Sequence, residues 1–176
     1  ELNEMIVKNG FHLNTGFLST YELLHVLTDY GHGDTAWKLM LQDTYPGWLY
    51  QLKYDATTVW ENWKGMEAGR EPKDSMNHYS FGTFAGWLMD RVAGIRVEKG
   101  KIRIQPYPDR QIGYVKASYD SPFGKIKSSW EYEGENCRIK VEIPANAHAE
   151  ILLPDGSCHE ADYGKYEYVI MENKHE

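Results

Sequence analysis

The residues best suited to chemistry surround Glu61, which follows one tryptophan, Trp60, and precedes another, Trp63, by two positions. Two interpretations of this pattern are open. In the first, the indole rings exclude water and offer flat faces to a sugar ring, while the carboxylate acts as an acid, a base or a ligand. In the second, Trp60 and Trp63 anchor a core and Glu61 points to solvent. Spacing alone does not decide between them.

A second candidate is the segment from Ser75 to Tyr79, which contains His78. We expect this segment to begin a helix, so His78 would lie near the positive end of the helix dipole. That position disfavours a charged ring and suits a neutral imidazole that hydrogen-bonds a polar substrate. A plainer interpretation is that Ser75 or Asn77 is the N-cap of the helix.

The remaining histidines of the first half do not form a metal site in the sequence. His25 and His32 are two helical turns apart, but Gly31 is expected to end the helix between them. No carboxylate or cysteine completes a ligand set with them or with His12. A phosphate-binding glycine loop and a Gly-x-Ser-x-Gly elbow are also absent from the sequence. We therefore expect neither a cofactor nor a metal.

The elements that position these residues are mostly helical up to residue 96. Apolar residues recur every three or four positions from Phe17 and stop at Gly31, a suitable left-handed C-terminal position. A second helix is predicted from Asp34, and a third from about Asn77 to Val92. The stretch 46–76 between them contains several glycines and prolines, and a loop of this length favours a functional role.

From about residue 97 the apolar pattern changes to a period of two, which is typical of strands. One such face runs from Ile126 to Tyr132 and another from Cys137 to Ile143. Turn sequences separate these runs and predict an antiparallel sandwich. We therefore predict two domains, residues 1–96 and 97–176. Because three helices cannot easily close a core, the first domain is expected to be part of a larger helical ring.

The composition excludes several classes of protein. The chain has 176 residues, a formal charge of −7 and 41% apolar residues. The deficit of cations argues against a nucleic-acid partner. No apolar run approaches the roughly 20 residues that span a bilayer, which argues against a membrane segment. The start at Glu1 has neither Met nor a leader, so we interpret the chain as part of a longer protein. Cys137 and Cys158 are either free thiols or one disulfide.

The motifs and their order resemble the C-terminal part of bacterial α-L-rhamnosidases of glycoside hydrolase family 78. The similarity extends over nearly the whole chain. It is carried by His12–Phe17, Leu27–Gly31, Gln42–Trp48, Ala56–Trp63, Met76–Gly82, Ile104–Pro106, Tyr119–Ile126 and Val141–Asn146.

The resemblance implies an α+β protein in which the last helices of an (α/α)6 barrel precede a β-sandwich. Members of this family release terminal α-L-rhamnose with inversion. By the matching motifs, Glu61 would be the general base and His78 would contact the bound rhamnose, with Trp60 as a further substrate-binding candidate. The family's general acid lies in a segment that this chain does not match. Since inversion requires two carboxyl groups roughly 6.5–9.5 Å apart, we expect the chain to be inactive alone.

Two other functions are consistent with the sequence. The chain could be a carbohydrate-binding unit that breaks no bond, or a structural assembly in which Glu61 is exposed and far from His78. The expected partners are a rhamnose-containing glycoside and either the missing N-terminal part of the parent chain or a second copy. Self-association would use exposed apolar faces at Trp37, Phe81 and Phe84.

Overall fold

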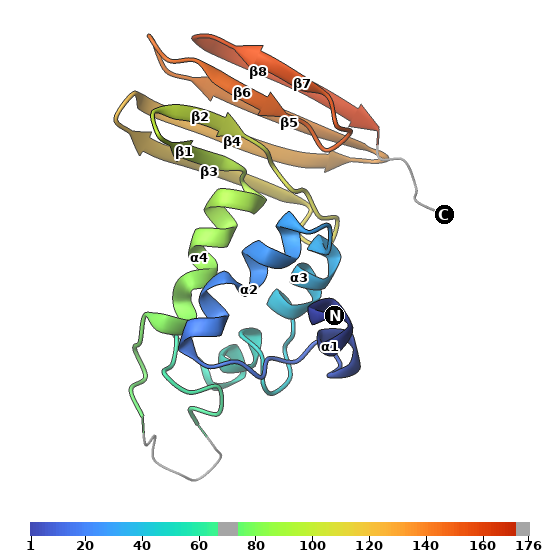
Figure 1. Cartoon of the computed structure of the whole chain (residues 1–176), viewed down its shortest axis with the longest axis vertical. Helices are drawn as coiled ribbons and strands as arrows, with labels where there is room; N and C mark the ends of the chain where they lie inside the picture. The colour runs from blue at the N-terminus through green and yellow to red at the C-terminus, as the bar shows by residue number, and fades with distance from the viewer. Residues whose placement is uncertain (67–73, 172–176) are drawn as a thin grey trace. The chain divides into compact units, whose positions relative to one another are not determined.

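The computed structural model describes residues 1–66 and 74–171 of the chain. It divides into two compact units, Glu1–Trp87 and Leu88–Glu176 (Figure 1). The first unit is helical. The change from helix to strand occurs at β1 (Ile95–Glu98), and the domain boundary at residues 96/97 stays a prediction. No helix in the described ranges is long and apolar enough to span a bilayer.

The helical unit contains α- and 3-10 helices connected by loops. In chain order they are α1 (Leu2–Lys8), α2 (Phe17–Asp29), α3 (Gly33–Met40), the 3-10 helices η1 (Leu49–Tyr54) and η2 (Ser80–Thr83), and α4 (Phe84–Trp87). Part of the predicted irregular stretch, residues 67–73, lies outside the described residues.

The first two predicted helices are confirmed as α2 and α3. After α2, Gly31 has a φ of +80°, which a glycine adopts without steric cost. Its N–H donates to the Thr28 carbonyl at 3.2 Å, and the N–H of His32 donates to the Leu27 carbonyl at 2.7 Å. These two bonds form a Schellman motif, so the local sequence determines where α2 ends.

The third predicted helix differs from the structure. Regular helix begins at Ser80 instead of Asn77, and it changes from 3-10 (η2) to α (α4) and then to a π-helix, η3 (Leu88–Val92). Two glycines in this segment lower its helix propensity. The prediction that Ser75 or Asn77 caps the helix is wrong, because the Ser75 hydroxyl exchanges hydrogen bonds with the backbone of Asn77 in a local turn.

The core of the helical unit is rich in aromatic side chains. The rings of Trp37 and Trp87 meet edge to face at 4.9 Å, and Trp63 stacks on Phe81 at 3.8 Å. Trp37 and Phe81 are therefore buried and Phe84 is half-buried, so the expected exposed faces at these residues are wrong. Large apolar side chains are instead exposed on α1 and α2, at Leu2, Met5, Val7, Phe17, Leu18, Tyr21 and Val26.

The second unit consists of η3 followed by strands in two four-stranded sheets. One sheet has the order β1-β2-β6-β7, and the other has the order β3-β4-β5-β8. The remaining strands are β2 (Lys101–Ile104), β3 (Tyr114–Ser121), β4 (Gly124–Glu133), β5 (Asn136–Ile143), β6 (Ala149–Leu152), β7 (Cys158–Ala161) and β8 (Gly164–Met171). The pairs are antiparallel except for β2 with β6, which is parallel.

The predicted period of two is confirmed in β4 and β5, where alternate residues from Ile126 and from Cys137 are buried. Two polar side chains on the buried face of β4 are satisfied. The Ser128 hydroxyl donates to the Ala93 carbonyl at 2.6 Å, and the Trp130 indole N–H donates to the Val92 carbonyl at 2.8 Å. The mixed α+β fold predicted from the sequence is therefore confirmed.

Candidate active site

The two candidate segments, which the sequence presented as separate motifs, lie side by side. The N–H of Glu61 donates to the Ser75 carbonyl at 2.9 Å, and the N–H of His78 donates to the Val59 carbonyl at 2.8 Å. These hydrogen bonds run in both directions between two loops that belong to no common helix or sheet. Glu61 and His78 therefore lie on two loops that are hydrogen-bonded to each other.

The Glu61 carboxylate is held by one oxygen. Its Oε2 accepts a hydrogen bond from the Ser75 N–H at 3.0 Å, and the side chain is half-buried. Within residues 1–66 and 74–171, no hydrogen bond to Oε1 is found. Beside it, the Asn62 amide donates to the Asp74 carboxylate at 3.2 Å and adds a further link between the two loops. A carboxylate that is oriented through one oxygen can use the lone pairs of the other to accept a proton.

The two tryptophans that flank Glu61 are core residues. Trp60 is 1% exposed and Trp63 is 9% exposed. The Trp63 indole donates to the Thr15 carbonyl at 2.9 Å, and Gly65 lies against the Trp60 ring, since a Cβ at Gly65 would be 2.0 Å from Trp60 Cε3. The packing interpretation thus describes both indoles, although Glu61 between them is not fully exposed. Direct contact of Trp60 with a substrate stays a prediction, and it requires the ring to be uncovered.

His78 is oriented by its neighbours. Its Nδ1 accepts a hydrogen bond from the Ser80 N–H at 3.3 Å. Since Nδ1 must then carry a lone pair, the neutral ring has its hydrogen on Nε2. The imidazole is nearly parallel to the ring of Phe17, at 4.9 Å and 19°, and to that of Tyr79, at 5.1 Å and 16°. In the described part of the chain, Nε2 has no hydrogen-bond partner, so it can donate to a ligand.

The other histidines of the helical unit are not part of this arrangement. His12 bonds through Nε2 to the Thr44 hydroxyl at 2.7 Å and through Nδ1 to the Asn9 carbonyl at 3.2 Å. His32 occupies the N-cap position of α3. Among the described residues, no group of three or more His, Cys, Asp or Glu side chains is arranged to hold a metal ion.

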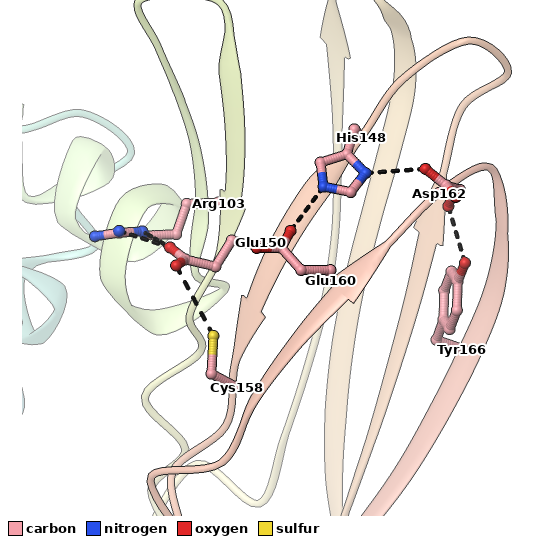
Figure 2. Close-up of polar contacts among 7 residues, drawn as sticks. All are labelled: Arg103, His148, Glu150, Cys158, Glu160, Asp162 and Tyr166. Carbon is pink, nitrogen blue, oxygen red and sulfur yellow. Dashed lines mark hydrogen bonds and ion pairs between the residues drawn. The ribbon is translucent and has the colours of Figure 1, made fainter.

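A separate polar cluster occupies the second unit, on and beside β6 and β7 (Figure 2). His148 bonds through Nε2 to Glu160 at 2.7 Å and through Nδ1 to Asp162 at 2.9 Å. Both hydrogen bonds raise the pKa of His148, with the bond to Asp162 as the larger cause. Arg103 and Glu150 form an ion pair next to it at 2.6 Å. Two carboxylate partners require both ring nitrogens to donate, so this geometry is that of an imidazolium.

Cys137 and Cys158 form no disulfide in the described part of the chain. Cys137 is buried in β5, whereas Cys158 is exposed at the start of β7. Partial desolvation and the neighbouring carboxylates of Glu150 and Glu160 raise the pKa of the Cys158 thiol. Of the two interpretations, two reduced thiols and a single disulfide, the structure therefore confirms the first.

Comparison with known families assigns the two halves of the chain. Residues 1–92 match the bacterial alpha-L-rhamnosidase 6 hairpin glycosidase domain, a class of glycoside hydrolase, and residues 100–166 match the bacterial alpha-L-rhamnosidase C-terminal domain. The chain belongs to the bacterial α-L-rhamnosidase family.

The individual relatives are named α-L-rhamnosidases. An α-L-rhamnosidase of Formosa agariphila is 37% identical over an alignment of 161 residues, and the match covers 88% of this chain and 17% of that protein. The crystal structure of an α-L-rhamnosidase from Aspergillus terreus superposes with a TM-score of 0.90 at 28% identity, over 96% of this chain and 21% of that one. The Streptomyces avermitilis α-L-rhamnosidase complexed with L-rhamnose gives 0.87 at 29% identity, over 95% and 19% of the two chains. The chain thus spans about a fifth or less of the length of these relatives.

Proposed function

We propose that this chain is the part of an inverting α-L-rhamnosidase that carries the general base, and that Glu61 is that base. In the same proposal, His78 contacts the terminal rhamnose of the substrate. The observation that supports it is the hydrogen-bonded pairing of the two loops, one of which contains the half-buried Glu61 carboxylate and the other His78 with an available N–H. Support for the substrate class comes from the S. avermitilis relative, which was crystallised with L-rhamnose.

Glu61 would act by removing a proton from water. The bond from the Ser75 N–H holds Oε2, so Oε1 is the oxygen that accepts the proton. The resulting hydroxide attacks the anomeric carbon while a second carboxyl group, on the other face of the sugar, protonates the departing glycosidic oxygen. His78 Nε2–H would donate to the rhamnose and fix its position relative to that water.

The second carboxyl group is assigned to a segment of the family that this chain does not match, so we expect the chain to be inactive by itself. The test is release of nitrophenol from a nitrophenyl α-L-rhamnoside by the purified chain, with a complete α-L-rhamnosidase as the positive control. Appreciable turnover by the chain alone would contradict the proposal that the acid lies elsewhere.

The role of Glu61 is tested by Glu61→Gln in the complete enzyme. Loss of a general base lowers kcat by about 10²- to 10⁴-fold, and the amide preserves the side-chain volume. The matched control is Glu131→Gln, the same change at an exposed position of β4. If Glu61→Gln keeps kcat within the range of the Glu131→Gln control, Glu61 is not the base.

The apolar side chains exposed on α1 and α2 fit the same proposal. We propose that they contact the other helices of a six-hairpin barrel and do not form an interface with a second copy. Leu18 is 93% exposed and Met5 63% exposed, and a group of such exposed apolar side chains is typical of a surface that contacts another part of a protein. Leu18 is then buried inside the complete enzyme, so Leu18→Asp should lower the Tm of that enzyme at every protein concentration. An unchanged Tm, or a lower Tm accompanied by a fall from dimer to monomer mass in size-exclusion chromatography with light scattering, would contradict the proposal.

A further inference from the structure

One segment of the helical unit contacts both loops of the proposed site. It comprises Thr15, Gly16 and Phe17, where the loop before α2 becomes helix. The Thr15 carbonyl accepts the indole N–H of Trp63 at 2.9 Å, two residues after Glu61. The ring of Phe17 is stacked on that of His78 at 4.9 Å. The segment belongs to the His12–Phe17 motif, to which the proposed reaction gives no role.

The segment is also connected to the core through two further aromatic side chains, Phe81 and Trp63. Phe17 packs against Phe81 at 5.0 Å, and Phe81 stacks on Trp63 at 3.8 Å with an interplanar angle of 24°. Trp63 returns to the segment through its bond to Thr15. The orientation of the Phe17 ring is therefore restricted, because the ring packs against Phe81 as well as against His78. A side chain fixed in this way can restrict the orientation of the imidazole that it covers.

We propose that Phe17 is a positioning residue that sets the direction of the His78 Nε2–H toward the sugar. The inference rests on the proposed function of His78. Stacking at an interplanar angle of 19° limits the tilt of the imidazole, whereas the bond from the Ser80 N–H to Nδ1 limits its rotation within its own plane. With both constraints, Nε2–H points in one direction before the substrate arrives, and less orientational freedom is lost on binding.

Two observations favour Phe17 over Tyr79 as the residue that performs this role. Tyr79 also stacks on His78, but it is 83% exposed. Phe17 comes from a different element and is held by the buried ring of Phe81.

The kinetic test uses Phe17→Leu in the complete enzyme, which keeps an apolar side chain but removes the flat face. We expect kcat/KM to fall by about tenfold, equivalent to about 1.4 kcal/mol of transition-state stabilisation. Phe17→Tyr keeps the ring and should retain most of kcat/KM. The control is Phe123→Leu, the same change at a residue of similar exposure, 37%, in the second unit.

A double-mutant cycle separates positioning from a general loss of structure. If Phe17 acts through His78, adding Phe17→Leu to a His78→Ala enzyme should cause no further loss. If Phe17→Leu lowers kcat/KM by the same factor with and without His78, or if Phe17→Tyr is as damaging as Phe17→Leu, the proposal is wrong.

A measurement without catalysis distinguishes this proposal from the proposed function. In the chain itself, the Cε1–H proton resonance of His78, assigned by its loss in His78→Gln, should be shifted upfield by the Phe17 ring and should move downfield in Phe17→Leu. An unchanged resonance refutes the stacking. If instead the resonance moves but Glu61→Gln keeps full activity, the stacking stands and the proposed function fails.

Discussion

Gly65 provides the sharpest test of how the site is built. It has a φ of +38° and lies against the indole of Trp60. An added Cβ would be 2.0 Å from Cε3 and 2.6 Å from Cδ2 of that ring, well inside van der Waals contact. Since Trp60 is 1% exposed, the ring has little room to move away. Gly65→Ala therefore combines backbone strain with steric overlap in the core.

The two contributions can be separated with Gly31→Ala. Gly31 also has a positive φ, +80°, but a Cβ there would meet nothing within 4 Å. We expect Gly31→Ala to cost about 1–2 kcal/mol of unfolding free energy from backbone strain alone. Overpacking adds about 1–3 kcal/mol, so Gly65→Ala should cost about 2–5 kcal/mol.

The assay is thermal unfolding followed by tryptophan fluorescence, which reports mainly on the helical unit because five of the six tryptophans lie within residues 1–87. A change of 1 kcal/mol shifts the Tm of a unit of this size by about 4–8 °C, so the difference between the variants is measurable. Equal Tm values for Gly65→Ala and Gly31→Ala would refute the contact between Gly65 and Trp60. Such a result would also remove the argument that Trp60 is covered.

Three further predictions concern the second unit. Ser128→Ala leaves the Ala93 carbonyl buried without its donor and should cost about 1–3 kcal/mol by thermal unfolding, whereas Ser129→Ala, one residue along, should change little; equal effects would contradict the buried hydrogen bond. His148 has a raised pKa in the folded state, so its contribution to stability is complete below the ordinary value of 6.5 and is lost as pH rises through the raised value. The Tm of His148→Gln should accordingly be lower than that of the unmodified chain at about pH 6 and approach it by about pH 9. A Tm difference that grows with pH would contradict a raised pKa of His148. A thiol reagent should modify only Cys158 in the native chain, and the reaction should become faster as pH rises. Modification of both cysteines before unfolding would contradict the burial of Cys137.

Local pattern predicted β4 and β5 well because the buried face of each can be read from alternate residues. In β5 the residues Cys137, Ile139, Val141 and Ile143 are all at most 2% exposed. The end of α2 was equally local, since Gly31 is the residue type that a left-handed position after a helix requires. The sequence could not show that β2 pairs in parallel with β6, because β3, β4 and β5 lie between these two strands in the chain and belong to the other sheet.

The third helix shows where local pattern failed. Helical spacing from Asn77 was real, but the backbone N–H of His78 bonds to Val59 and that of Ser75 bonds to the Glu61 carboxylate. These bonds to a distant loop compete with helix formation, so the helix begins only at Ser80. The motif that was expected to start a helix is instead one side of the candidate site.

By itself the sequence determined that helices precede strands, which residue types are available for chemistry and which family the chain resembles, because these depend on composition, spacing and motif order. Only the tertiary structure decided that Glu61 and His78 lie on paired loops, that Trp60 is covered by Gly65, and that Phe17 is stacked on His78. The physical reason is that hydrogen bonds between loops and the burial of a ring depend on segments that are distant in the chain. Spacing along one segment does not contain that information.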